Sequence, residues 1–223
     1  MLFRSFPVTI KTIEYKGYTI QIEDDTDSES PREWGNLGTM CLFHRHRNLP
    51  NESSLSMEEA QGLDHRTNLI LPVYGYEHGG LSISTGKFFH NWDSGQLGVI
   101  YVSHERIKQE YKDVPFEEAL EKAKGILENE VKIYNQYLTG EVFAYVTLDK
   151  LGEIVDSCCE FYDMEGCVNR AKDAIDSIVE RKVLVVLDMV TDEGWHVKDR
   201  KYMDRRKAEE LVRKNPKIYR IEE

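Results

Sequence analysis

The chain has 223 residues, of which 40% are apolar and 31% charged, and its formal net charge is -11. This length fits one domain, or one domain with a small appendage, and can bury a core without disulfides or a structural metal. The acidic excess argues against direct nucleic-acid binding, which needs a basic face. No stretch approaches the apolar length of a membrane-spanning helix, and the N-terminus lacks the apolar core of a signal peptide. We therefore expect a cytoplasmic protein with no membrane partner.

The first hundred residues show the alternation that is typical of strands. Residues 8–24 are predicted to form a β-hairpin that turns at Lys16-Gly17, and a polar loop containing Pro31 follows. Pro72 is expected to place its strand at the edge of a sheet or to break it. Further strands are predicted over residues 38–46, 69–76, 81–85 and 98–102, and a short helix, capped by Ser56, over 56–61.

Helical periodicity begins at Ser103, which is a candidate N-cap for a short helix over 104–111. A longer helix is predicted from Pro115 to Leu138, and Gly140 ends it. Its apolar residues recur at steps of three and four and form one stripe, which predicts a face packed on the core. The stripe consists of Ala119, Leu120, Ala123, Ile126, Leu127, Val131, Tyr134 and Leu138.

The remaining residues alternate between strands and helices. A second hairpin over 142–162 turns near Gly152, and a helix is predicted over 164–182. The tail is predicted as strand 183–187, a turn at Asp192-Glu-Gly, strand 195–198, helix 204–214 and strand 218–221. We predict an α+β fold with antiparallel or mixed sheets built from hairpins and grouped helices. Residues 1–182 would form the main domain, and 183–223 a small βαβ-like subdomain that is separate from it or continuous with it.

Charge is distributed unevenly, because residues 198–220 hold ten basic and four acidic residues. The helix over 204–214 also carries Glu209 and Glu210, so we interpret it as a mixed-charge solvent face. The overall acidity either keeps the protein soluble or makes it an acidic mimic of nucleic acid.

A metal site is one hypothesis for the polar segments. Asp24, Asp25 and Asp27 lie in an acidic loop, and His44 and His46 are two residues apart on a predicted strand, where both would face the same side. Together they could hold a metal that acidifies a water for phosphodiester hydrolysis. The alternative is a solvated loop and two histidines satisfied by their neighbours.

Two further loops carry residues suited to binding. The first contains Arg32, Trp34 and Asn36, and the second, over residues 90–96, contains Trp92, Asp93 and Gln96. An exposed tryptophan beside polar groups suits a contact with a protein or a small ligand. The alternative is that each tryptophan fills the core while its neighbours form a turn.

Several runs resemble a family of uncharacterised proteins encoded by bacteriophages and prophages. They are Glu14-Tyr-Lys-Gly-Tyr, Ser30-Pro-Arg-Glu-Trp-Gly-Asn-Leu-Gly-Thr-Met, Phe43-His-Arg, Trp92-Asp-Ser-Gly-Gln-Leu-Gly-Val-Ile-Tyr-Val-Ser and Tyr134-Asn-Gln-Tyr-Leu-Thr-Gly-Glu-Val. The resemblance spans about residues 14–180 and assigns no catalytic residue. It implies a mobile element acting inside a bacterium.

The favoured hypothesis is therefore a non-enzymatic protein that binds a host defence protein or sequesters a small signalling molecule. The chain has no GxSxG, Walker A or GxGxxG run that would indicate a hydrolase or a nucleotide site. This hypothesis requires no cofactor. The oligomeric state, the metal-dependent hydrolase and the acidic mimic stay open.

Overall fold

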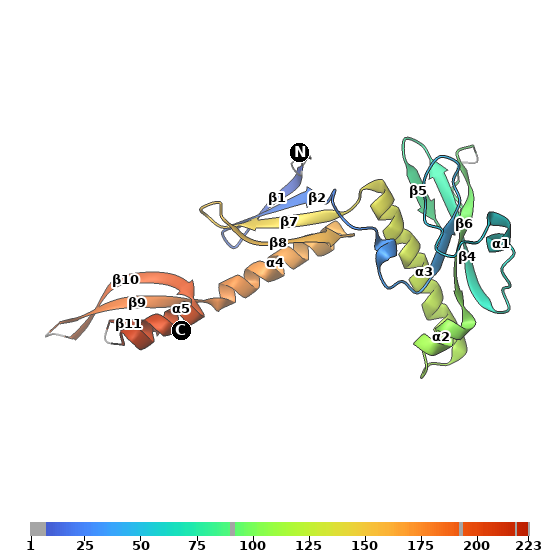
Figure 1. Cartoon of the computed structure of the whole chain (residues 1–223). Helices are drawn as coiled ribbons and strands as arrows, with labels where there is room; N and C mark the ends of the chain where they lie inside the picture. Colours follow the sequence, from blue (N-terminus) through green and yellow to red (C-terminus); the bar gives the residue numbers. More distant parts are fainter. Residues whose placement is uncertain (1–7, 90–91, 192–193, 217, 223) are drawn as a thin grey trace. The chain divides into compact units, whose positions relative to one another are not determined.

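The computed structural model describes residues 8–89, 92–191, 194–216 and 218–222 (Figure 1). The chain divides into two compact units. The first consists chiefly of Asp24–Ala144, with Met1–Val8 and Cys159–Met164, and the second of Thr9–Glu23, Tyr145–Cys158 and Glu165–Glu223. The boundary predicted after residue 182 falls inside the second unit, where a helix passes into a strand, and it stays a prediction. The α+β class is confirmed by the mixture of sheets and helices.

The first unit is built on a four-stranded antiparallel sheet in the order β3-β6-β4-β5. The helix α3 lies along one face of this sheet (Figure 1). Its strands are β3 (Thr39–Leu42), β4 (Asn68–Glu77), β5 (Leu81–Ser84) and β6 (Ser94–Ser103).

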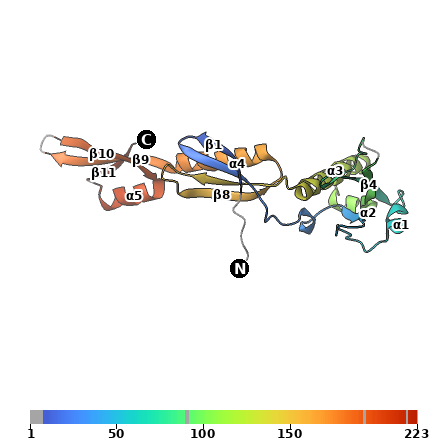
Figure 2. The ribbon, with the colours of Figure 1, turned by 90° about the horizontal axis from the view of Figure 1, so that it is seen from above.

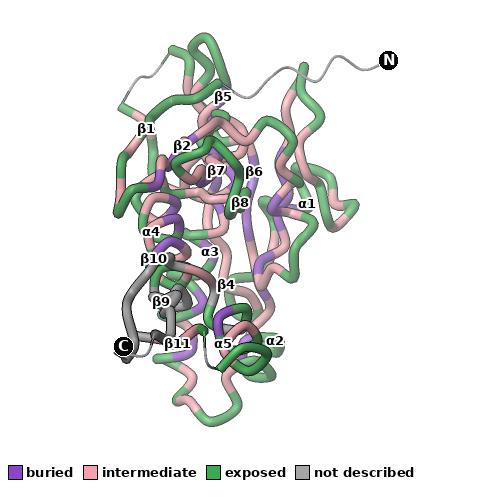
Figure 3. Tube along the Cα trace, turned by 90° about the vertical axis from the view of Figure 1, so that its left-hand side faces the viewer, coloured by how far each residue is buried: buried purple, intermediate pink, exposed green. Residues whose placement is uncertain are grey.

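Strand alternation divides the apolar residues of this sheet between two cores. Met40, Ile100 and Val102 pack with α3, whereas Cys41 and Val99 pack with Ala60 of the short helix α1 (Met57–Gln61). Because both faces are covered, buried residues occupy consecutive positions in β3 and β6, and Figure 3 shows buried stretches of the chain in purple.

The helices of this unit begin and end where their capping residues predict. Ser56 and Glu59 form a complete capping box at α1, and Ser103 accepts a hydrogen bond from the Arg106 backbone N–H at α2 (His104–Glu110). The helix α3 (Phe116–Thr139) ends at Gly140, whose φ of 74° is the left-handed conformation that glycine tolerates. A single turn of 3-10 helix, η1 (Pro31–Glu33), lies in the loop before β3.

Pro72 neither breaks its strand nor lies in an outer strand of the sheet. It pairs with Val99 of β6, while β5 pairs only with Tyr74–Glu77 of β4. The side of β4 that faces β5 is therefore unpaired at Pro72, where a missing N–H removes no ladder bond. The prediction was right that one side of the strand is unpaired at Pro72. It was wrong that the strand is an outer strand of the sheet.

The second unit contains a sheet in the order β1-β2-β7-β8, with α4 (Met164–Arg181) beside it (Figure 2). The predicted turn at Lys16-Gly17 is confirmed, and both residues have positive φ, 49° and 79°. The buried helix residues Cys167, Ala171 and Ile175 recur every fourth position. The strands are β1 (Thr9–Tyr15), β2 (Tyr18–Asp24), β7 (Phe143–Leu148) and β8 (Ile154–Phe161).

The C-terminal segment of the second unit forms a three-stranded antiparallel sheet in the order β10-β9-β11, and α5 contacts all three strands. The strands β10 and β11 thus run parallel on either side of β9, joined by α5, as in the predicted βαβ arrangement. Of the predicted turn at 192–194, residues 192 and 193 lie outside the described residues. The elements are β9 (Lys182–Thr191), β10 (Gly194–Asp204), α5 (Arg205–Lys214) and β11 (Tyr219–Glu222).

Candidate functional site

Arg32 is the centre of a buried ion-pair network in the first unit. Its guanidinium donates to both carboxylate oxygens of Glu52 at 2.7 and 2.9 Å, to Glu130 at 2.9 Å and to the Gly38 carbonyl at 2.8 Å. Only 6% of the Arg32 side chain is exposed. Burial lowers the pKa of this guanidinium, but its hydrogen bonds to Glu52 and Glu130 outweigh that effect and raise the pKa. Arg32, which was predicted to bind a partner, uses its guanidinium for these bonds within the first unit.

Glu130 connects this ion-pair network to the loop segment 34–38. Its Oε1 accepts hydrogen bonds from the backbone N–H groups of Leu37, at 2.7 Å, and Gly38, at 3.2 Å. Because Glu130 lies on α3, these bonds attach the segment 34–38 to a rigid helix. The Asn36 side chain also donates to the carbonyls of Pro31 and Trp34 and so closes the loop on itself.

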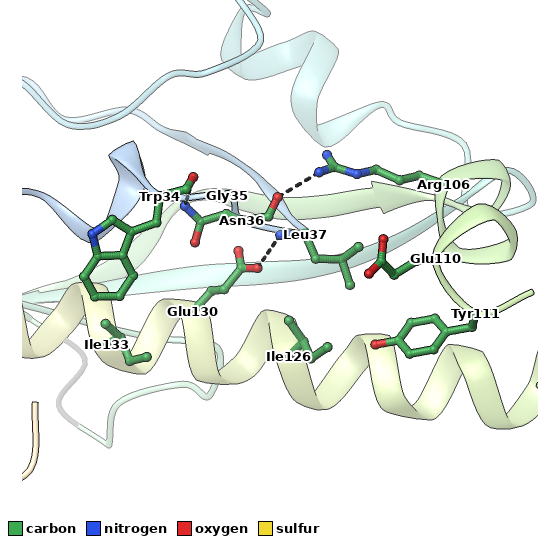
Figure 4. Close-up of a pocket in the computed structure, with 10 residues that line it drawn as sticks. All are labelled: Trp34, Gly35, Asn36, Leu37, Arg106, Glu110, Tyr111, Ile126, Glu130 and Ile133. Atoms are coloured by element: carbon green, nitrogen blue, oxygen red, sulfur yellow. Dashed lines mark hydrogen bonds between the residues drawn. The ribbon is translucent and has the colours of Figure 1, made fainter.

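An open groove of about 350 Å³ lies beside this loop (Figure 4). We call it the α2–α3 groove. Ile126 and Ile133 of α3 lie along its floor, Trp34 at one end and Tyr111 at the other (Figure 4). Trp34 and Ile126 are 42% and 38% exposed, so both leave apolar surface uncovered. The lining residues are Trp34, Gly35, Asn36, Leu37, Arg106, Glu110, Tyr111, Ile126, Glu130 and Ile133.

Trp34 packs against an aromatic neighbour and is partly exposed. Its ring lies edge-on to Tyr162, with 5.5 Å between the ring centroids, while its exposed surface borders the groove. Tyr162 is itself partly buried, and burial, followed by the nearby Glu160 and Asp25 carboxylates, raises the pKa of its phenol. An aromatic ring supported in this way is a preorganised contact surface.

The polar side chains of the groove offer both donors and acceptors. Arg106 donates to the Asn36 carbonyl at 2.8 Å and directs the rest of its guanidinium along the rim. Within the part of the chain that the structure describes, Glu110 forms neither a hydrogen bond nor an ion pair. Glu130 is neutralised by Arg32, so one cation and one anion at the α2 side are the charges available to a ligand.

The acidic loop does not form the predicted metal site. Asp25 accepts a hydrogen bond from the Glu160 backbone N–H at 2.9 Å, Asp24 is the last residue of β2, and Asp27 is exposed. Among the residues that the structure describes, no group of three His, Cys, Asp or Glu side chains lies close enough together to hold a metal. In this loop a backbone N–H contacts one oxygen of the Asp25 carboxylate, and the described residues bring no set of three ligands together around it.

The histidine pair is also placed differently from the prediction. The strand β3 ends at Leu42, so His44 and His46 lie after it, in a bent segment where side chains two residues apart need not share a face. The two ring nitrogens of His44 contact the Glu77 carboxylate, at 3.2 Å, and the His46 backbone N–H, at 3.1 Å. His44 is thus satisfied by its neighbours, as the alternative interpretation held.

The second predicted binding loop does not border the groove. Trp92 is 99% exposed, Asp93 accepts a backbone hydrogen bond from Glu77 at 2.9 Å, and Gln96 lies within β6 opposite Tyr74. Residues 90 and 91 of this loop lie outside the described residues. Trp92 therefore does not fill the core, and of the six predicted binding residues only Trp34 and Asn36 line the groove.

The α-helical wall of the groove was missed in the sequence, although one signal was present. Glu130 lies three residues after Leu127 and four before Tyr134, both of which are buried on α3. A carboxylate at that position within an apolar stripe requires a buried partner. Ile126 was assigned to the core stripe, whereas it lies at its margin and is exposed to the groove.

No family model, curated protein or solved structure matches this chain. Among the described residues, none of the helices has both the length and the apolar character required to cross a bilayer.

Proposed function

We propose that this chain is a non-enzymatic binding protein, encoded by a phage or another mobile element, that captures a host protein in the α2–α3 groove. One observation carries the proposal. Trp34 and Ile126 leave apolar surface exposed in a groove whose loop is clamped by the buried Arg32–Glu52–Glu130 network.

The Arg32–Glu52–Glu130 network favours binding because a flexible loop would lose conformational entropy when a partner orders it, and that loss weakens affinity. The segment 34–38 is already ordered by the Glu130 carboxylate and by the Asn36 side chain. Fully burying an exposed apolar side chain contributes about 1.5–3 kcal/mol, and covering the exposed 42% of Trp34 or 38% of Ile126 contributes a part of that. A partner that covers Trp34 and Ile126 would therefore bind without the entropy loss of ordering this loop.

A protein segment fits the groove better than a small molecule does. The floor is aliphatic, the two ends are aromatic, and Arg106 and Glu110 lie at the α2 side (Figure 4). This pattern suits an apolar side chain on a backbone that offers both carbonyl and N–H groups. The bacterial setting follows from the phage-like runs, which supports a host protein as the partner.

A small ligand is the second candidate, and the volume of the groove favours it. The value of about 350 Å³ lies at the lower end of the range of ligand pockets. Native mass spectrometry of the chain recovered from host lysate would detect such a ligand. Its retention by the wild type and loss from a Trp34→Ala variant would favour this candidate over the host protein.

The host-protein proposal is tested with two tryptophan variants. Immobilised wild type, Trp34→Ala and Trp92→Ala chains are exposed to bacterial lysate, and bound proteins are quantified by mass spectrometry. We expect a partner that Trp34→Ala loses and Trp92→Ala retains, because only Trp34 lines the groove. The reverse result would move the contact to the 90–96 loop. A partner bound equally by all three chains, or no partner, would refute the groove.

A further inference from the structure

The sign of the charge reverses near the C-terminus. Residues 198–220 hold ten basic and four acidic residues, a net charge of +6. Because the whole chain carries -11, the other 200 residues carry -17. A strong charge asymmetry along one chain indicates a part that contacts a polyanion.

Half of these basic residues lie in the helix α5. One side of this helix packs on the sheet, and other side chains of the helix are exposed to solvent. Ala208 is fully buried and packs with Met203, Leu211, Tyr219 and Ile221. Arg205, Arg213 and Lys214 are all exposed. Lys214 pairs with Glu210 at 2.6 Å. Arg205 and Arg213 form no hydrogen bond or ion pair with any residue that the structure describes, so their guanidinium groups face solvent.

Basic residues open the helix α5, directly after Asp204. Its first turn contains no acidic residue and begins Arg205-Arg206-Lys207. Cations near the positive end of a helix are unfavourable by roughly 0.3–1 kcal/mol each. A local rule broken in this way is common where the charge serves a binding function.

The spacing of the free arginines suits a polymer of regular charges. Arg205 and Arg213 are eight residues apart, which separates them by about 80° around α5 and by about 12 Å along its axis. Glu209 lies midway between them. A chain of phosphates can meet both arginines at once, whereas a single acidic side chain can meet only one.

We propose that the outer face of α5 binds nucleic acid through its phosphate backbone, without reading its sequence. This inference revises the expectation drawn from the overall charge, because that charge averages an acidic majority with a basic helix. It does not depend on the α2–α3 groove.

The test is fluorescence anisotropy of a labelled 20-base-pair DNA duplex with the full chain, at 50 and 200 mM salt. Neutralising about three phosphates predicts an affinity that falls about 40-fold between these salt concentrations. Arg205→Gln with Arg213→Gln should weaken binding and reduce the slope of log affinity against log salt by about 1.8. Glu209→Gln should tighten binding, because it removes a negative charge between the two arginines.

The matched control is Lys124→Gln with Lys132→Gln, two exposed lysines of α3. This pair should leave binding unchanged. Equal weakening by the control pair would overturn the assignment to α5, as would an unaltered affinity of the arginine variant. No binding at 50 mM salt would overturn the proposal entirely. Polyglutamate bound as tightly as DNA would show instead that the helix takes acidic proteins.

Discussion

Replacing Arg32 with methionine tests whether the buried network holds the groove. The substitution keeps an unbranched apolar stem and removes the guanidinium, with its bonds to Glu52, Glu130 and the Gly38 carbonyl. We expect two effects, a loss of stability in the first unit and a loss of partner binding in the α2–α3 groove.

The magnitude follows from what the substitution leaves behind. Removing one partner of a buried ion pair costs roughly 3–5 kcal/mol, because the other charge stays buried. Glu130 is only 10% exposed, but it keeps two backbone N–H donors, and Glu52 is 27% exposed and keeps the Met40 N–H. These remaining bonds place the expected loss at the lower end, at about 3 kcal/mol.

The free energy of unfolding is measured by urea titration followed by tryptophan fluorescence, since Trp34 lies next to the network. The control is Arg66→Met, whose ion pair with Asp64 is on the surface and should contribute nothing measurable.

A loss below about 1 kcal/mol for Arg32→Met, or one equal to that of Arg66→Met, would refute the argument. It would show that the guanidinium is hydrated in solution and that the loop 34–38 is ordered by other contacts.

Four further predictions follow from single positions. Gly98→Ala should cost about 3 kcal/mol in urea titrations, because its Cβ would lie 1.9 Å from the Cys41 carbonyl oxygen, whereas Gly95→Ala in the same strand meets nothing within 4 Å. Glu160→Gly should raise the free energy of unfolding by about 1 kcal/mol, because Glu160 has a φ of 63°; an equal gain from Glu160→Ala would refute this cause. Thr147→Val should be neutral or stabilising by about 1 kcal/mol in thermal melts, since no described residue forms a hydrogen bond with the buried Thr147 hydroxyl. Burial raises the pKa of Tyr134 to about 12; stability should therefore be lost as the pH rises from about 10 through 12, and Tyr134→Phe should flatten that loss.

The sequence predicts most elements of this fold because their signals are local. The capping box at Ser56, the N-cap at Ser103 and the glycine at 140 mark helix ends within a few residues. The boundaries of strands are less well determined. Residues 94–96 were assigned to a loop and belong to β6, because pairing with β4, which is distant in sequence, extends the strand.

The candidate site was predicted only in part, because its residues are far apart in the sequence. Trp34 and Asn36 stood out by their chemistry, but the other wall of the groove comes from α2 and α3. Glu130, one of the two carboxylate partners of Arg32, lies ninety-eight positions later in the chain. Pairing between residues so distant leaves no periodicity, and the acidic loop attracted a metal hypothesis although a backbone N–H occupies the Asp25 carboxylate.

The division of the chain has a consequence for how the molecule is made. The strands β2 and β7 are neighbours in one sheet, yet most of the first unit, Asp24–Ala144, is inserted between them. During synthesis the β1–β2 hairpin leaves the ribosome first. Its partner strands β7 and β8 are synthesised only after the inserted segment Asp24–Ala144. The insert can thus complete its own core before the host sheet closes. The same topology makes the insert removable in principle, since a short turn could join β2 directly to β7 and leave a smaller protein that carries the basic helix alone.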